Sequence, residues 1–187
     1  MVKPIGVIGA GGWGIALAKL LADKGERVTL WCHGAETYRE LQETRESRAY
    51  LAGITVPPGV RITQSIEESV SDQFMIVCAV PSHAVPEVMA SACAHVSSQT
   101  FVLCCTKGLE EKSQNTMAEV LAEIFGEDVQ EPTVVGEQQP RGRGRQSQFV
   151  CDRSDQRLAT LGLDSVVGPQ RGEGRIEVVD ADRDVAV

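Results

Sequence analysis

The strongest constraint on the fold of this chain is a glycine pattern close to its first residue, Gly9-x-Gly11-x-x-Gly14. A short apolar run at 5–8 precedes the pattern, and apolar residues at helical spacing follow it at 15–21. This order predicts a strand, a tight turn and a helix whose free N–H groups favour an anion. In such turns the first glycine permits the bend, the second admits a pyrophosphate and the third lets the helix pack closely. The pattern therefore indicates a dinucleotide-binding turn, although glycine-rich turns also reach this spacing by chance.

The alternation of strand-like and helix-like segments continues as far as residue 135. The strand segments are rich in β-branched and apolar residues, and the helical ones carry an apolar stripe, with Ser113 placed to cap the last of them. Strands alternating with helices predict a Rossmann-type, doubly wound parallel α/β sheet with helices on both faces. The predicted strands are 5–8, 27–31, 60–63, 73–81, 100–108 and 132–135. The predicted helices are one with a stripe of Leu17, Leu20 and Leu21 that ends at Gly25, two at 35–48 and 84–94, and one between Ser113 and Gly126.

The composition changes abruptly after residue 135. The segment 136–187 has eight arginines and no lysine, whereas 1–135 has five of each. Its only strand-like pieces are 165–167 and 176–179. The sequence therefore predicts a dinucleotide-binding domain at 1–135 and an irregular or disordered tail at 136–187. Translation of a shifted reading frame would give the same composition and is the alternative interpretation of this tail.

The charge and the cysteines restrict the class of protein further. A formal net charge of -8 argues against a nucleic-acid binder, which needs a basic face. No apolar run approaches the roughly 18 residues of a membrane span, and no secretory leader is recognisable, so we expect a cytoplasmic protein without membrane contact.

The six cysteines contain no CxxC pair, which favours reduced, buried thiols over metal ligands or disulfides. They are Cys32, Cys78, Cys93, Cys104, Cys105 and Cys151.

The end of the second predicted strand is where such domains select their nicotinamide cofactor. An acidic residue there binds the ribose hydroxyls of NAD, and a basic residue accommodates the extra phosphate of NADP. Here the chain reads WCHGAE, with His33 in the expected region and no carboxylate before Glu36. The sequence thus favours NADPH over NADH, while an exposed histidine without a role is the alternative.

Five separated segments together resemble the bacterial type of NAD(P)-dependent sn-glycerol-3-phosphate dehydrogenase, over about residues 3–135. The resemblance implies reversible hydride transfer between NAD(P)H and dihydroxyacetone phosphate, which yields sn-glycerol 3-phosphate for phospholipid synthesis. In combination these segments also argue against a hydroxyacid or UDP-sugar dehydrogenase. They are GAGGWGIALA (9–18), VTLWCH (28–33), AYLAGITVP (49–57), VPSH (80–83) and CTKGLE (105–110).

The resemblance also implies roles for single residues. Gly12 and Trp13 would contact the cofactor phosphates, and His33 would lie at the adenosine end. Tyr50 would line the cofactor side of the cleft. Pro81 ends a neighbouring strand at the same edge of the sheet, so its position predicts that it lines the cofactor cleft as well. Lys107 would contact both cofactor and substrate, because a lysine after a parallel strand can hold a phosphate or polarise a carbonyl. Trp13 packed against the sheet and Lys107 as a solvated loop lysine are the alternatives.

The departures from the family pattern concern catalysis. After the last predicted strand the family has a serine, glycine and proline segment, where this chain reads GEQQPRGRG. The family then continues into a helical domain with an acid/base lysine, but no lysine follows Lys112 here. We therefore expect a truncated or frame-disrupted dehydrogenase that binds nucleotide and turns over little or nothing. A non-catalytic NAD(P)-binding module and a relic without cofactor affinity are the alternatives, and the oligomeric state is left open.

Overall fold

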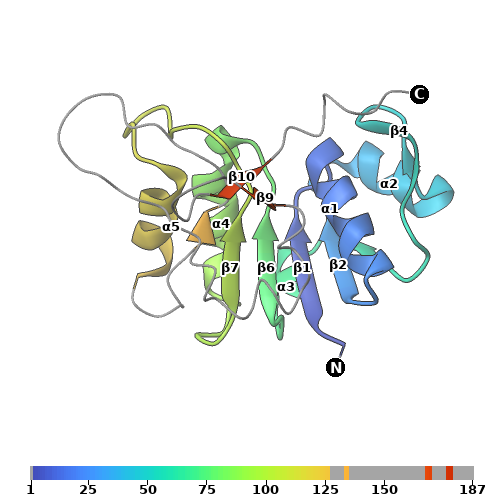
Figure 1. Cartoon of the computed structure of the whole chain (residues 1–187), viewed down its shortest axis with the longest axis horizontal. Helices are drawn as coiled ribbons and strands as arrows, with labels where there is room; N and C mark the ends of the chain where they lie inside the picture. Colours follow the sequence, from blue (N-terminus) through green and yellow to red (C-terminus); the bar gives the residue numbers. More distant parts are fainter. Residues whose placement is uncertain (1, 127–132, 135–166, 170–175, 179–187) are drawn as a thin grey trace.

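The computed structural model describes residues 2–126 and the strand segments 133–134, 167–169 and 176–178 (Figure 1). Two of these segments, β9 (Val167–Pro169) and β10 (Ile176–Val178), form an antiparallel pair. The remainder of the predicted irregular or disordered tail at 136–187 lies outside the described residues. The fold that positions the candidate site is therefore that of residues 2–126 with the strand at 133–134.

The centre of the fold is a six-stranded sheet in the order β5-β2-β1-β6-β7-β8. Every neighbouring pair in this sheet is parallel. In chain order the strands run 3-2-1-4-5-6 across the sheet, which is the Rossmann arrangement. The predicted doubly wound fold is thereby confirmed. The strands are β1 (Pro4–Ile8), β2 (Arg27–Trp31), β5 (Arg61–Thr63), β6 (Met75–Cys78), β7 (Phe101–Cys104) and β8 (Thr133–Val134).

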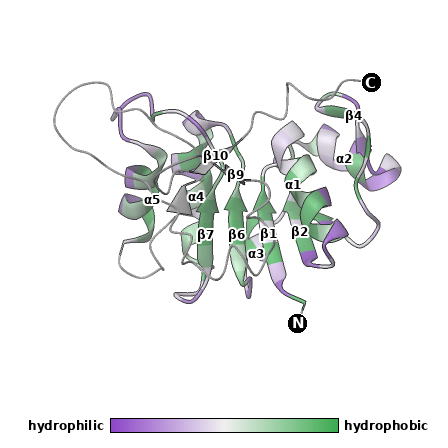
Figure 2. Ribbon diagram, in the orientation of Figure 1, coloured by the Kyte–Doolittle hydropathy of each residue, from purple (hydrophilic) through white to green (hydrophobic). Residues whose placement is uncertain are grey.

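Helices cover both faces of the sheet because successive strand residues point to opposite sides. In β1, Ile5 and Val7 pack in one hydrophobic cluster with α1 (Gly12–Asp23). Ile8 packs in a second cluster with α3, α4 and α5 on the other face. The strands are accordingly almost continuously hydrophobic (Figure 2). The remaining helical elements are α2 (Ala35–Thr44), α3 (Ile66–Val70), α4 (Val85–Cys93), α5 (Met117–Phe125) and the 3₁₀ turn η1 (Ser82–Ala84).

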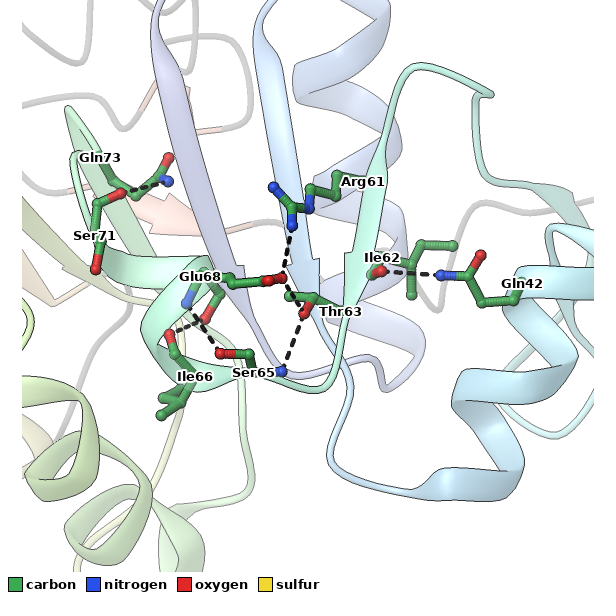
Figure 3. A network of polar contacts seen from close by, with 10 residues as sticks. Gln42, Arg61, Ile62, Thr63, Ser65, Ile66, Glu68, Ser71 and Gln73 are labelled. Carbon is green, nitrogen blue, oxygen red and sulfur yellow. Dashed lines mark hydrogen bonds and ion pairs between the residues drawn. The ribbon is translucent and has the colours of Figure 1, made fainter.

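The edge strand β5 is connected to α3 by a polar network (Figure 3). The Glu68 carboxylate forms an ion pair with Arg61 at 2.8 Å and accepts a hydrogen bond from the Thr63 hydroxyl, also at 2.8 Å. The Ser65 hydroxyl caps α3 by accepting from the Glu68 backbone N–H at 3.2 Å. Helix α3 is absent from the elements predicted from the sequence, although the Ser-x-x-Glu spacing of Ser65 and Glu68 is a capping signal.

The predicted helix at 35–48 is too long. Helix α2 ends at Thr44, because Arg45 adopts the left-handed conformation with φ of 58°. A short hairpin follows, formed by β3 (Glu46–Ser47) and β4 (Leu51–Thr55). The Glu46 carboxylate closes it by accepting from the Gly53 N–H at 2.7 Å. The AYLAG segment therefore folds as a hairpin that extends beyond the main sheet.

The predicted cap of the last helix is wrong by three residues. Helix α5 begins at Met117, and Thr116 caps it in a capping box with Glu119. The Glu119 N–H donates to the Thr116 hydroxyl at 3.3 Å, and the Thr116 N–H donates to the Glu119 carboxylate at 2.8 Å. Ser113 lies in the preceding turn, where its hydroxyl accepts from the Asn115 N–H. Thr116 is the cap because Glu119 lies three residues after it, which is the spacing that a capping box requires.

Thr116→Ala is expected to lower the free energy of unfolding by about 1 kcal/mol, because the first turn of α5 loses its side-chain acceptor. Urea unfolding followed by circular dichroism measures the change. Ser113→Ala is the matched control, with an expected change within about 0.5 kcal/mol. A larger loss for Ser113→Ala than for Thr116→Ala would contradict this assignment of the cap.

Candidate dinucleotide-binding site

The candidate site lies along the edge of the sheet where the parallel strands end. In Figure 1 the arrowheads of β1, β6 and β7 point to this common edge. Four loops leave it, at 9–11, 32–34, 79–81 and 105–108. The strand order reverses between β1 and β6, so the loop after β1 lies at the switch point where ligands bind in open α/β sheets.

The three glycines of the GxGxxG pattern have different structural roles. Gly9 has φ of +118°, and a Cβ on it would lie 2.8 Å from the Ala79 carbonyl oxygen. A Cβ on Gly14 would overlap the Gly9 carbonyl oxygen, so this glycine lets α1 pack against the turn. A Cβ on Gly11 would meet no heavy atom within 4 Å. Gly9 and Gly14 are thus needed by the fold itself, whereas Gly11 faces open space.

The beginning of α1 is suited to an anion. Gly11 is the N-cap residue of α1, and no side chain caps the helix there. Its first N–H groups and the positive end of the helix dipole therefore face the space next to Gly11. This open space at an uncapped helix start fits the pyrophosphate of a dinucleotide.

The hairpin of β3 and β4 meets the glycine turn through its backbone. A Cβ on Gly12 would lie 2.9 Å from the Tyr50 carbonyl oxygen, so the hairpin needs a glycine at this position. The Tyr50 side chain itself is 55% exposed. The hairpin thereby brings Tyr50 to the glycine turn.

Trp13 is half-buried and packs against the hydrophobic core together with Cys105, which follows β7. Burial raises the pKa of the Cys105 thiol to about 12, so it is neutral at physiological pH. Trp13 therefore contributes to the packing of the core next to the glycine turn.

His33 lies at the end of β2 and is exposed. Its ring centroid is 5.6 Å from that of Trp31. The Trp31 indole N–H donates to the Gln64 carbonyl at 3.1 Å, and the Gln64 side-chain amide donates to the His33 carbonyl at 3.4 Å. The chain after β5 thus holds His33 in place, on the opposite side of β1 from Lys107.

The loops after β6 and β7 lie against each other. The Thr106 hydroxyl donates to the Val80 carbonyl at 2.7 Å. A Cβ on Gly108 would lie 3.8 Å from the Ser82 hydroxyl oxygen. Pro81 and Lys107, one in each loop, are both exposed. The structure therefore brings together the glycine turn, Pro81 and Lys107, and places His33 across the turn from them.

The cysteines within the described residues are free thiols, and Cys32, Cys78 and Cys104 are buried. A hydrogen bond with Cys104 and burial raise the pKa of Cys78 well above its usual value. In the described part of the chain, no group of three or more His, Cys, Asp or Glu side chains is placed to hold a metal ion. Cys151 lies outside that part. His83 and His95 are both exposed.

A parallel sheet in this order, with a glycine turn and an uncapped helix at the switch point, defines the Rossmann class of dinucleotide-binding domains. The family described as NAD-dependent glycerol-3-phosphate dehydrogenase N-terminus matches residues 4–137. The chain therefore belongs to the NAD-dependent glycerol-3-phosphate dehydrogenase family, which confirms the resemblance found in the sequence.

Individual relatives agree with this membership. The chain is 36% identical over 126 residues to glycerol-3-phosphate dehydrogenase [NAD(P)+] of Pelotomaculum thermopropionicum, an alignment covering 67% of this chain and 36% of that protein. It is 42% identical over 121 residues to the enzyme of the same name from Prosthecochloris aestuarii, covering 65% and 36%. The crystal structure of glycerol-3-phosphate dehydrogenase from Coxiella burnetii superimposes with a TM-score of 0.63 at 32% identity, covering 67% and 38%.

The matched region spans little more than a third of the length of these relatives. It coincides with the part of the chain that forms the sheet and its helices. No helix in the described part of the chain is long and apolar enough to cross a membrane.

Proposed function

We propose that this chain binds NAD(P)H at the carboxyl edge of its sheet, as the nucleotide-binding part of a glycerol-3-phosphate dehydrogenase in the cytoplasm. The observation that carries the proposal is the space beside Gly11, which lies at the uncapped beginning of α1. Backbone N–H groups there suit a pyrophosphate. The family membership supplies the identity of the dinucleotide.

The residues of the site receive distinct roles in this proposal. Gly9 and Gly14 shape the turn, Gly11 admits the pyrophosphate, and Gly12 and Trp13 contact the cofactor phosphates. His33 contacts the adenosine ribose and favours NADPH, while Tyr50 and Pro81 line the space for the dinucleotide. Lys107 contacts the nicotinamide end and the substrate. These site residues are Gly9, Gly11, Gly12, Trp13, Gly14, His33, Tyr50, Pro81 and Lys107.

The substrate pair that we propose is dihydroxyacetone phosphate and sn-glycerol 3-phosphate. The reduced nicotinamide, when bound, supplies the hydride for the ketone. The Lys107 ammonium offers a positive charge to the substrate phosphate or to the ketone oxygen. The alkoxide formed at that oxygen then needs a proton donor, which typically contributes about 10² to 10⁴ in rate.

We place the nucleotide-binding domain at 1–135 and treat 136–187 as a separate segment. Lys112 is the last lysine of the sequence, so the acid/base lysine of the family pattern has no counterpart among the 187 residues. We therefore propose weak or absent turnover for this 187-residue chain. Function as a non-catalytic NAD(P)-binding module is the second candidate, favoured by this same observation.

Titration of the purified 187-residue chain with NADPH and with NADH tests the proposed function. Trp13 lies in the glycine turn and Trp31 ends β2, so bound dinucleotide is expected to quench their fluorescence, with Kd in the micromolar range and the lower value for NADPH. Absence of quenching and of calorimetric heat with both dinucleotides would reject the proposal. Steady NADPH-dependent reduction of dihydroxyacetone phosphate would instead refute the weak turnover.

His33→Asp is expected to raise the Kd for NADPH about tenfold and to leave that for NADH equal or lower. The introduced carboxylate repels the 2′-phosphate of NADPH and can accept the ribose hydroxyls of NADH. A tenfold change corresponds to ~1.4 kcal/mol. His95→Asp is the matched control, because His95 is exposed and follows α4, away from the site. An unchanged ratio of the two Kd values would remove His33 from cofactor selection.

A further inference from the structure

Thr106 has a buried hydroxyl at the place where two central strands separate. Its side chain is 6% exposed. The ladder between β6 and β7 ends with the pair Cys78 and Cys104, followed by a last backbone hydrogen bond from the Cys105 N–H to the Cys78 carbonyl at 2.8 Å. Beyond this point the Thr106 hydroxyl connects the two segments, by donating to the Val80 carbonyl at 2.7 Å. A side chain thus extends the connection after the backbone ladder has ended.

Both segments that Thr106 connects belong to the candidate site. On one side, the Val80 side chain would lie 3.1 Å from a Cβ on Gly9, so Val80 packs directly on the glycine turn. On the other side, Lys107 directly follows Thr106. Gly108 then turns the chain with φ of +104°, next to Ser82. Lys107 is therefore held between two residues that both touch the loop after β6.

We propose that Thr106 is a positioning residue for Lys107. Its hydroxyl holds the Lys107 loop against the Val80 segment, and thereby at a fixed distance from the glycine turn, so that the ammonium faces the nicotinamide end of a bound dinucleotide. This role rests on the proposed function, because Lys107 is assigned there to cofactor and substrate. Without the hydroxyl, the buried Val80 carbonyl loses this donor, and a buried polar group without a partner drives local rearrangement.

The test uses isosteric and conservative variants of the 187-residue chain, with NADPH as the probe. Thr106→Val keeps the shape and removes the donor, and Thr106→Ser restores it. Thr100→Val is the matched control, since the buried Thr100 hydroxyl donates to the Gln73 carbonyl at 2.9 Å at the opposite end of β7. We expect Thr106→Val to raise the Kd for NADPH about fivefold to tenfold, equivalent to roughly 1 kcal/mol. Thr106→Ser and Thr100→Val are expected to stay within about twofold.

A double-mutant cycle with Lys107→Met separates positioning from general stability. If Thr106 acts through Lys107, Thr106→Val changes the Kd less than about twofold once Lys107→Met is present. Three results would each overturn the positioning role. The first is an equal effect of Thr106→Val on the Kd with and without Lys107→Met, and the second is an unchanged Kd in Thr106→Val alone. The third is a loss of NADPH affinity in Thr100→Val equal to that in Thr106→Val.

Hydrogen exchange without ligand gives a second readout. Thr106→Val is expected to accelerate exchange of the Lys107 and Gly108 amides, and Thr100→Val is expected to leave them unchanged. Unchanged exchange in Thr106→Val would overturn the inference regardless of affinity. If the unmodified chain fails to bind NADPH, the proposed function fails, and the role of Thr106 in binding fails with it. If the unmodified chain binds NADPH and the Thr106 variants bind it with unchanged Kd, only the role of Thr106 is overturned.

Discussion

Gly14→Ala is expected to lower the free energy of unfolding by about 3 kcal/mol or more, the largest stability effect among the variants of this turn. The added Cβ would overlap the Gly9 carbonyl oxygen and approach the Ala79 Cβ at 3.6 Å. Both obstacles are held by the sheet, so α1 must shift away from β1 and lose packing of its buried stripe. Overpacking of well-packed positions typically costs about 1–3 kcal/mol, and more where backbone must move.

Urea unfolding followed by circular dichroism and tryptophan fluorescence measures this effect. Gly11→Ala is the control within the same turn, because its Cβ meets no atom within 4 Å and its φ is -76°. Its expected loss is within about 1 kcal/mol, the usual scale for exchanging residues at an N-cap. Equal stability of the Gly14→Ala and Gly11→Ala proteins would contradict the close helix–turn contact.

The sheet could be predicted because the signal for each strand lies in consecutive residues of the sequence. Each of β1, β6 and β7 has four consecutive residues that are buried on both faces of the sheet, and this pattern is itself the signal for a parallel strand covered by helices. The glycine turn was predictable for the same reason, since the strand, the three glycines and the helix are contiguous. Right-handed crossovers then restrict the order of the strands to a few arrangements.

The errors arose where short-range signals compete. The polar periodicity at 35–48 continues past the real end of α2, which a single left-handed residue, Arg45, determines. At α5 both Ser113 and Thr116 are suitable capping residues, and the position of Glu119 decides between them. Helix α3 is only five residues long, too short for an apolar stripe to reveal it.

The supporting residues of the site were missed because their partners are distant in the sequence. Thr106 and Val80 are 26 residues apart, and Gln64 and His33 are 31 apart. Neither pairing has a sequence motif, since each depends on which strands become neighbours. Gly6 is a similar case, because a Cβ on it would overlap the Ser69 carbonyl oxygen of α3. Motif residues were thus identifiable from the sequence, and the residues that hold them were not.

Gly11→Ala is expected to raise the Kd for NADPH on the order of a hundredfold, or ~2.7 kcal/mol, while the protein stays folded. The glycine at this position lets the backbone approach the pyrophosphate, and a methyl group there would occupy that space. Because the space is open in the structure, the substitution costs the fold little and affects only what enters from outside. Fluorescence titration with NADPH, carried out after circular dichroism has established a native fold, measures the change.

Gly59→Ala is the control for this loss of affinity, since a Cβ on Gly59 also meets no heavy atom within 4 Å but lies in an exposed turn before β5. Its Kd is expected to stay within about twofold of the unmodified value. If the turn is needed both for the fold and for binding a pyrophosphate, Gly14→Ala must lower the stability of the protein and Gly11→Ala must lower its affinity for NADPH. Unchanged NADPH affinity in a folded Gly11→Ala protein would show that the dinucleotide binds elsewhere, because no pyrophosphate lying on this turn can avoid the added methyl group.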